Sequence, residues 1–203
     1  GAHRINHIHF EDDNLTLDED RFKKILDGMA NRGLKISWDT PNGVRADMLD
    51  EDTLKKCKEN GCVYLVMGVE SGSPEILKNI VKKGLSLDAV EKTARAAKKI
   101  KLNLEAFFVI GFPGETIADM KKTLRFAFKL QFCHGVYPIL FAATPIPGTE
   151  LYEICRGKGY IRSDFSYARI SASILKEGMI ETEDFKPFDI RRLFGYFKAV
   201  RGA

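Results

Sequence analysis

Apolar and polar residues follow two periods along this chain, and together they predict strands and helices in turn. Short runs rich in apolar and β-branched residues predict strands. We place these strands at residues 5–10, 34–38, 63–69, 102–110 and 136–142. Between them, apolar residues recur at the spacing of one helix face. Five such repeats in series predict an α/β fold with a parallel sheet and right-handed crossovers, either part of a (β/α) barrel or an open doubly wound sheet.

Capping residues mark where the helices should begin. Thr16-Leu-Asp-Glu19 has the spacing of a capping box, and Ser73-Pro74 predicts an N-cap followed by the first helical residue. The other helical stretches start at or after Asp50, Ser86, Thr116 and Thr149. After Tyr160 the helical period is weaker. Residues 179–185 predict a connecting segment, and residues 190–200 predict a terminal amphipathic helix.

Composition narrows the class of protein. Of the 203 residues, 44% are hydrophobic and 30% are charged, which suits one large α/β domain with a substantial core. The net charge of +4 is spread over helix faces, with no basic stripe interleaved with aromatics, so we expect no nucleic-acid partner. No apolar run has membrane-spanning length, and no signal peptide opens the chain. The four cysteines fit neither paired zinc ligands nor an iron-sulfur loop, which predicts free thiols and a cytoplasmic location.

Polar side chains and glycines concentrate where each predicted strand passes into the next helix. In parallel α/β folds these joints lie on one face, so we expect their side chains to converge on one ligand site. The joints are Glu11-Asp-Asp-Asn14, Asp39-Thr-Pro-Asn42 with Arg45, Glu70-Ser-Gly72, Gly111-Phe-Pro-Gly-Glu115 and Thr144-Pro-Ile-Pro-Gly148.

The residue types at the joints indicate what the ligand is. Asp12 and Asp13 could receive an ammonium group, and Arg45 could pair with a carboxylate. Glu70 could accept two hydrogen bonds from a ribose diol, and Gly111 could let an adenine lie against the backbone. An adenosine that carries an amino acid has all of these features. Each residue also has a structural alternative: the two aspartates as caps, Arg45 in a surface ion pair, Glu70 as a turn cap and Gly111 as a turn glycine.

The same residues, taken in order, resemble the motifs of radical S-adenosylmethionine (radical SAM) enzymes. The similarity is greatest to the branch that commonly carries an N-terminal cobalamin-binding domain. The segments that carry it are Phe10-Glu-Asp-Asp-Asn14, Pro41-Asn-x-Val-Arg45, Gly68-Val-Glu-Ser-Gly72, Val109-Ile-Gly-Phe-Pro-Gly-Glu-Thr116 and Thr144-Pro-x-Pro-Gly-Thr149.

The resemblance implies a partial (β/α)6 TIM-like barrel, truncated at its first strand to five βα units, over residues 1–160. Residues 161–203 would form a short C-terminal extension with a terminal helix. For S-adenosylmethionine, the family pattern implies nine cofactor-binding residues: Asp12 and Asp13 near the methionine amino group, Asn42 and Arg45 near the methionyl end or ribose, Glu70 and Ser71 at the ribose, Val109 and Gly111 at the adenine, and Thr144 after the last strand. It also places Lys83 near the cofactor carboxylate. No residue of this chain is expected to be catalytic or to bind a metal.

One element of the family pattern is absent from this sequence: the CxxxCxxC loop whose thiolates hold a [4Fe-4S] cluster. We therefore expect a fragment, inactive alone, of an enzyme that cleaves S-adenosylmethionine reductively to start radical chemistry such as methyltransfer or cyclisation. The intact enzyme would act on a small-molecule substrate and could bind cobalamin. The missing N-terminal segment would be a partner of the strand at 5–10, whose open edge could otherwise support a homodimer.

Two other functions stay open. The chain could be a non-catalytic barrel fragment or a protein-binding module. Alternatively, His7-x-His9 resembles the metal pair of TIM-barrel metallohydrolases, because strand alternation puts both imidazoles on one face. Such an enzyme needs further histidine ligands downstream, and only His134 follows. A pair of strand histidines near the surface of an edge is the simpler interpretation.

Overall fold

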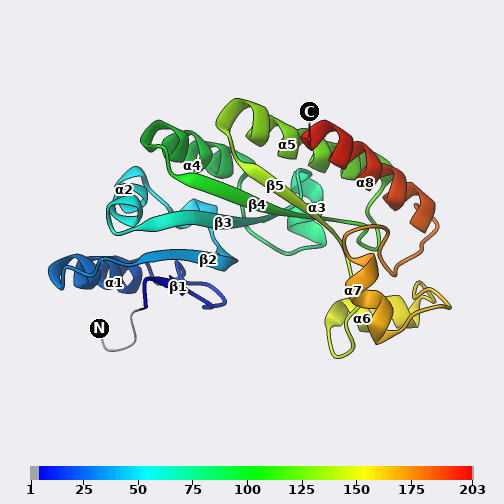
Figure 1. Cartoon of the computed structure of the whole chain (residues 1–203). Helices are drawn as coiled ribbons and strands as arrows, with labels where there is room; N and C mark the ends of the chain where they lie inside the picture. Colours follow the sequence, from blue (N-terminus) through cyan, green and yellow to red (C-terminus); the bar gives the residue numbers. More distant parts are fainter. Residues whose placement is uncertain (1–4, 203) are drawn as a thin grey trace. The chain divides into compact units, whose positions relative to one another are not determined.

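The computed structural model describes residues 5–202, in which strands and helices alternate as labelled in Figure 1. The strands are β1 (His7–His9), β2 (Ser37–Val44), β3 (Cys62–Glu70), β4 (Asn103–Ile110) and β5 (Tyr137–Ala142). The helices are α1 (Glu19–Asn31), α2 (Glu51–Glu59), α3 (Pro74–Asn79), α4 (Leu87–Ile100), α5 (Ile117–His134), α6 (Glu150–Gly157), α7 (Tyr167–Ser173) and α8 (Pro187–Arg201), with a short 3-10 helix at Ala46–Met48.

The five strands form one sheet in the order β1-β2-β3-β4-β5. β1 pairs with β2 and β2 with β3, both in parallel, and His9 lies opposite Asp39 in the first pair. The predicted α/β fold with a parallel sheet is therefore confirmed. None of the described helices is long and apolar enough to cross a membrane.

The chain forms two compact units. The first contains residues 5–69, 85–107 and 129–137, and the second contains residues 70–84, 108–128 and 138–202. The proposed boundary at residue 160 marks the end of the sequence resemblance and stays a prediction.

The core of the first unit is built around Trp38 of β2, whose side chain is fully buried. Phe10 and Phe22 pack edge-on against its ring, with centroids 5.3 and 6.3 Å away. The indole N–H, which cannot be left unpaired in an apolar core, donates to the Asn60 carbonyl oxygen at 2.8 Å. This packing fixes α1 against β2 and aligns the carboxyl end of β1.

The core of the second unit joins α5 and α8. The Phe128 ring stacks on that of Phe197, with centroids 5.6 Å apart, and meets the Tyr196 ring edge-on. The terminal helix predicted at 190–200 is thus present, and its apolar face is covered by α5. The short helix α7 is not predicted by the sequence pattern, because seven residues give too little periodicity to detect.

Two local predictions are wrong. The first helix does not begin at the capping box: Asp18 is its N-cap and accepts from the Arg21 N–H at 2.9 Å. The Thr16 hydroxyl instead accepts from the Arg45 N–H at 3.2 Å. The second strand begins at Ser37 rather than Leu34 and ends at Val44, so Asp39 to Asn42 lie inside it. Pairing with β1 and β3 decides these bounds, and the local apolar run does not.

Candidate functional site

The loop after β3 is held against α5 by hydrogen bonds. Ser71 is fully buried, and its hydroxyl lies 3.0 Å from that of Thr123 on α5. The Thr123 hydroxyl also accepts from the Gly72 N–H at 3.0 Å, and the Ser71 hydroxyl accepts from the Ser73 N–H at 3.1 Å. Ser71 thus holds the loop against α5, while its predicted contact with ribose stays a prediction.

Gly72 is required in this loop because of a close approach, not because of its backbone angles. A Cβ at Gly72 would lie 2.7 Å from Thr123 Cα and 2.8 Å from the Lys122 carbonyl oxygen. Both atoms belong to the backbone of α5 and cannot turn aside. The loop therefore lies directly on the helix, which fixes the residues that precede it.

Glu70 is the last residue of β3 and directly precedes this anchored loop. Its φ of +69° lies in the left-handed region, where non-glycine residues are uncommon. The carboxylate is a quarter exposed and accepts from the Lys83 ammonium group at 3.2 Å. Strained backbone of this kind persists where the surroundings fix it, often at ligand sites. A carboxylate held in this way keeps lone pairs for a ligand beyond those used by Lys83.

The loop after β4 is closed by a buried carboxylate that the sequence pattern does not single out. Glu115 is 0% exposed, and its Oε2 accepts from the N–H groups of Gly111 at 2.6 Å and Phe112 at 3.1 Å. Its Oε1 has no hydrogen-bond partner. Burial raises the pKa of Glu115 to about 7, against the lowering effect of the two N–H donors. Glu115 therefore fixes the backbone at the end of β4.

Asp119 ties the two loops of the second unit together. Its carboxylate accepts from the Thr116 hydroxyl at 2.6 Å and from the Ser73 hydroxyl at 3.2 Å. The hydrogen bond from Thr116, followed by that from Lys122, lowers the pKa of Asp119 to about 2. The Thr116 hydroxyl in turn accepts from the Asp119 N–H, which confirms Thr116 as the cap of α5. Only the spacing of Thr116 and Asp119 could have suggested this pair.

The other predicted residues of the second unit lie near the ends of β4 and β5. Val109 is half-buried, and Gly111 has a φ of +91°. A Cβ at Gly111 would meet Ile190 at 3.3 Å and Phe185 at 3.8 Å, so the C-terminal segment covers that side of the backbone. The Thr144 hydroxyl donates to the Ala142 carbonyl oxygen at 3.0 Å. Contacts of Val109 and Gly111 with adenine, and of Thr144 with the cofactor, stay predictions.

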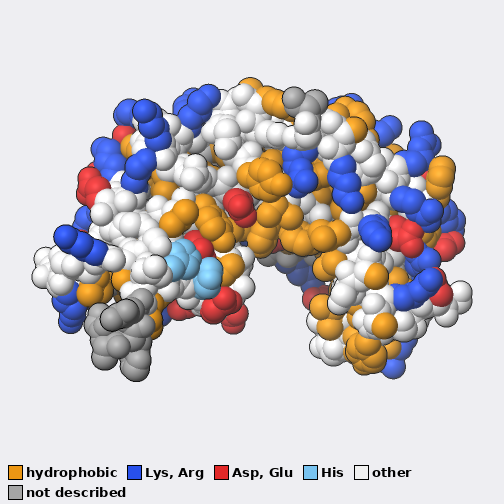
Figure 2. Space-filling model, viewed as in Figure 1, with side chains coloured by type: hydrophobic (Ala, Val, Ile, Leu, Met, Phe, Trp, Pro, Cys, Tyr) orange, Lys and Arg blue, Asp and Glu red, His pale blue; other side chains and the backbone are white. Residues whose placement is uncertain are grey.

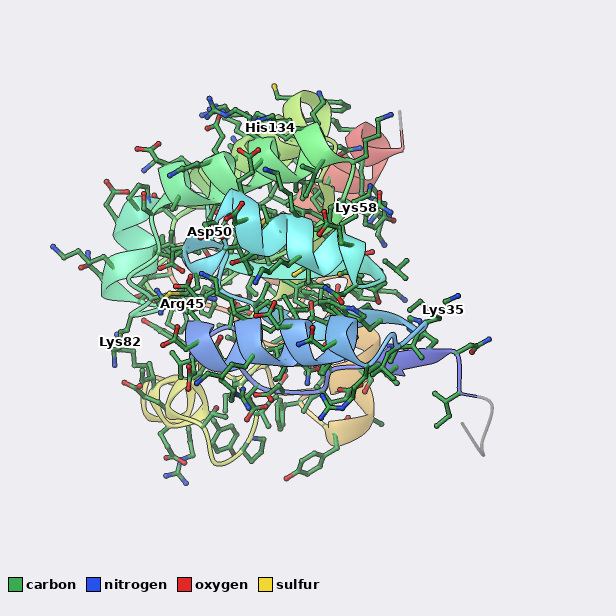
Figure 3. All side chains as sticks on the ribbon, turned by 90° about the vertical axis from the view of Figure 1, so that its left-hand side faces the viewer. Lys35, Arg45, Asp50, Lys58, Lys82 and His134 are labelled. Carbon is green, nitrogen blue, oxygen red and sulfur yellow. The ribbon has the colours of Figure 1, made fainter. Side chains whose placement is uncertain are left out.

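The first unit holds the four remaining predicted residues, and of these Arg45 is in the structural alternative stated for it, a surface ion pair. Asp12 pairs with Arg21 at 3.3 Å, and Asp13 is exposed. The Asn42 amide donates to the Glu11 carbonyl oxygen at 3.0 Å, which joins the end of β1 to β2. Arg45, labelled in Figure 3, pairs with Asp47 at 2.6 Å. These partners are exposed or half-exposed, so a ligand could compete for them at small cost.

The four cysteines do not fit an iron-sulfur cluster. They lie on four different elements, and Cys57, Cys62 and Cys155 are buried. Burial raises the pKa of Cys57 to about 12 and that of Cys155 to about 11, which opposes the thiolate form that a cluster needs. Cys57, Cys62 and Cys155 are small buried apolar residues, whereas Cys133 is an exposed thiol.

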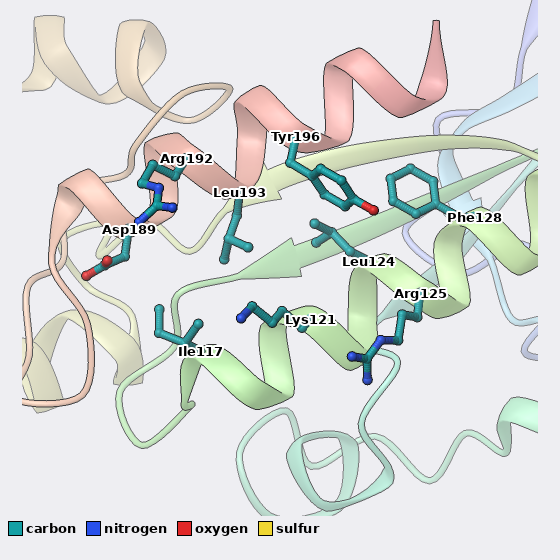
Figure 4. Close-up of a pocket in the computed structure, with 9 residues that line it drawn as sticks. All are labelled: Ile117, Lys121, Leu124, Arg125, Phe128, Asp189, Arg192, Leu193 and Tyr196. Carbon is teal, nitrogen blue, oxygen red and sulfur yellow. The ribbon is translucent and has the colours of Figure 1, made fainter. Parts of the chain in front are cut away.

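A separate cavity of about 460 Å³ lies between α5 and α8 in the second unit (Figure 4). Leu124, Phe128 and Leu193 give it an apolar floor, and Lys121, Arg125 and Arg192 give it a basic rim. None of the predicted cofactor residues lines it. It does not contribute to the candidate site.

Comparisons with known proteins agree with this geometry. Residues 2–127 match the family described as the radical SAM superfamily. The chain is 30% identical over 182 residues to cytidylyl-2-hydroxyethylphosphonate methyltransferase of Streptomyces wedmorensis, covering 87% of this chain and 33% of that protein. It is 37% identical over 149 residues to an uncharacterized methyltransferase of Pyrococcus horikoshii, covering 73% and 31%. The chain thus spans about a third of the length of these relatives.

Solved structures share the fold. The radical S-adenosylmethionine methyltransferase TsrM of Kitasatospora setae, solved with cobalamin and a [4Fe-4S] cluster, matches with a TM-score of 0.64 at 16% identity, over 95% of this chain and 38% of that chain. Coproporphyrinogen III oxidase of Escherichia coli, a radical SAM enzyme, matches with a TM-score of 0.65 at 13% identity, over 98% and 43%. With the family match over more than half of its residues, this chain belongs to the radical SAM superfamily.

Proposed function

We propose that this chain is the cofactor-binding part of a radical SAM enzyme and that it binds S-adenosylmethionine at the carboxyl ends of its strands. The nucleoside would lie in the second unit, with the ribose diol on Glu70 and the adenine along residues 109–112. The observation that carries this proposal is the position of Glu70. Its carboxylate is partly exposed on a strained backbone, and the loop that follows is locked to α5 by Ser71 and Thr123.

A vicinal diol suits this carboxylate because its two hydroxyls can donate to the two carboxylate oxygens. Lys83 occupies one side of the carboxylate at 3.2 Å and limits its rotation. The fixed loop means that little side-chain or backbone freedom is lost on binding. For the methionyl end, we retain Asp12, Asp13, Asn42 and Arg45 of the first unit as the proposed contacts.

The role proposed for this chain stops at binding and orienting the cofactor. In the intact enzyme, a [4Fe-4S] cluster held outside these residues would cleave S-adenosylmethionine reductively. The relatives with methyltransferase names make methyl transfer to a small-molecule substrate the favoured reaction. TsrM, which was solved with cobalamin, supports cobalamin as a further cofactor in this proposal. We further propose that the segment preceding β1 in the intact protein pairs with its outer edge, with a homodimer as the alternative.

Binding of S-adenosylhomocysteine tests the proposal directly, because this analogue has the same nucleoside and needs no cluster. We expect calorimetric titration to give saturable heat. Glu70→Ala should raise the Kd about tenfold, the effect of losing charge-assisted hydrogen bonds. Alanine at a φ of +69° is no less strained than glutamate. The substitution therefore removes the carboxylate without relieving the backbone strain at this position.

Glu150→Ala is the matched control, because Glu150 also pairs with a lysine, Lys82, at an exposed site. It should leave the Kd within twofold of that of the unmodified chain. If no heat is seen at millimolar S-adenosylhomocysteine, or if both variants weaken binding equally, the chain does not bind the cofactor through Glu70. A non-catalytic scaffold would then be favoured.

Anaerobic reconstitution with iron and sulfide tests the assignment of the cysteines. We expect no stable broad absorption near the wavelengths typical of [4Fe-4S] clusters, because three thiols are buried and all four lie on different elements. Titration with a thiol reagent before unfolding should react chiefly with Cys133. A cluster at one equivalent per chain would show that the cysteines move together on metal binding and that this assignment is wrong.

A further inference from the structure

His7 and His9 of β1 meet Asp39 of β2 in the first unit. Strand alternation puts both imidazoles on one face of the sheet, and the parallel register sets Asp39 beside them. Asp39 Oδ2 lies 2.9 Å from His7 Nε2, and Asp39 Oδ1 lies 2.7 Å from His9 Nδ1. The three donor atoms lie within 4.8 Å of one another. The downstream histidine, His134, contacts Glu91 instead.

The Ser37 hydroxyl contacts the His7 ring and can set its tautomer. The Ser37 hydroxyl donates to the Asn6 carbonyl oxygen at 3.1 Å, so it must accept from the His7 Nδ1–H at 2.7 Å. A neutral imidazole with its proton on Nδ1 has a lone pair on Nε2. Nε2 lies 2.9 Å from Asp39 Oδ2, so a bound cation would find this nitrogen lone pair and the carboxylate side by side.

The surroundings of Asp39 favour a cation. Asp39 is 2% exposed, and within the described residues no lysine or arginine forms an ion pair with it. Among the described residues, its basic partners are the two imidazoles. Burial of a carboxylate is costly, and coordination of a metal ion is one of the ways in which proteins offset that cost.

We propose that His7, His9 and Asp39 bind a divalent first-row transition-metal ion, with Zn²⁺ as the best match. Two imidazole nitrogens and one carboxylate oxygen are a common set of three protein ligands for zinc, and water would complete the tetrahedron. Tetrahedral coordination needs donors about 3.3 Å apart, so the ion would replace the two histidine–carboxylate contacts with only small side-chain movements. Ser37 would be a positioning residue, which sets the His7 tautomer.

The site is open to an incoming ion. The exposed fractions of the His7 and His9 side chains are 32% and 56%, and Figure 2 shows histidine side chains at the molecular surface beside acidic ones. The carboxylate lies beneath them, 3% exposed. This is the arrangement of a site with three fixed ligands and an open position for water or a further ligand.

Cobalt binding tests the proposal, because Co²⁺ takes zinc sites and absorbs visible light with an intensity that reports tetrahedral geometry. Chelator-treated protein should bind one equivalent of Co²⁺, with a strong visible band that one equivalent of Zn²⁺ removes. His9→Gln and Asp39→Asn should abolish the band. Ser37→Ala, which frees His7 to change tautomer without removing a ligand, should weaken Co²⁺ binding about tenfold.

Three variants serve as controls. His134→Gln and His3→Ala remove the other two histidines, and Cys133→Ser removes the exposed thiol; each should keep the band. Circular dichroism identifies any variant that fails to fold. If a ligand variant does not fold, the Co²⁺ affinity of Ser37→Ala decides whether the proposal holds. The proposal is overturned if the chain binds less than a fifth of an equivalent of Co²⁺, if the band survives His9→Gln, or if Ser37→Ala binds as tightly as the unmodified chain. In any of those cases the three side chains form only a hydrogen-bonded cluster.

Discussion

Gly72→Ala should lower the free energy of unfolding by about 3 kcal/mol, at the upper end of what overpacking usually costs. The added Cβ would meet backbone atoms of Thr123 and Lys122 at 2.7 and 2.8 Å, and the Phe126 Cβ at 2.8 Å. Because a helix backbone cannot yield, the loop must move away from α5. That movement would break the contacts of Ser71 and Gly72 with the Thr123 hydroxyl. Urea unfolding monitored by circular dichroism measures the loss.

Gly195→Ala provides the matched control for this substitution. Gly195 lies inside α8, is exposed and has nothing within 4 Å of where a Cβ would be. Alanine there should stabilise the chain by about 0.5 to 1 kcal/mol, because glycine is a poor helix former. If Gly72→Ala costs less than about 1 kcal/mol, the loop is not held against α5 as described. The argument that Glu70 is presented by a rigid loop would then lose its basis.

The buried carboxylate of Glu115 should make the chain less stable as the pH rises. Its pKa is raised to about 7 in the folded chain, against an ordinary value of 4.5. Between these two pH values the folded state binds more protons than the unfolded state, so the free energy of unfolding falls as pH increases. The loss should be complete above pH 7 and should amount to about 3 kcal/mol, from roughly 1.4 kcal/mol per pKa unit.

Glu115→Gln isolates this contribution, because glutamine keeps the oxygen that accepts from the Gly111 and Phe112 N–H groups but does not ionise. The free energy of unfolding of the variant should change much less between pH 5 and pH 8 than that of the unmodified chain. Asp119 does not interfere, because its pKa of about 2 places its contribution below this range. Parallel pH profiles for the two proteins would show that Glu115 is ionised throughout, contrary to this prediction.

Much of the fold could be predicted because its signals are local. Asp50, Ser86 and Thr149 each cap the helix that follows, and each accepts from a backbone N–H within three residues. Ser73 also precedes its helix as predicted, although its hydroxyl donates to Glu75 and Asp119 instead. The strand at Cys62–Glu70 is clear from sequence because a long β-branched and apolar run fits few alternatives.

What could not be predicted depends on contacts between distant segments. The bounds of β2 are set by its neighbours in the sheet, which the apolar residues around Leu34 do not reveal. Thr16 looks like a cap, but its hydroxyl is used by Arg45, far along the chain. The sequence places Glu115 in a motif but does not show that its carboxylate accepts a hydrogen bond from the Gly111 N–H. That contact depends on how Gly111 and Gly114, both at positive φ, turn the backbone toward Glu115.

The sequence identifies the polar residues at the strand ends, but it does not identify the side chains that they contact. Glu70 and Gly111 both have positive φ angles, and their contacts with a ligand stay predictions. Ser71 is instead a buried support, and Arg45 has a partner in Asp47. The alternation that places His7 and His9 on one face could be predicted, whereas Asp39 joins them through the sheet register alone.

Two side chains from the C-terminal segment, Phe185 and Ile190, cover the backbone at Gly111. Phe185 and Ile190 come from the last part of the chain, yet they form a wall at the end of β4. Exchanging these two side chains would reshape that wall without altering any strand. Because both side chains come from the C-terminal segment, substitutions there would change access to the end of β4 while every strand residue stays the same.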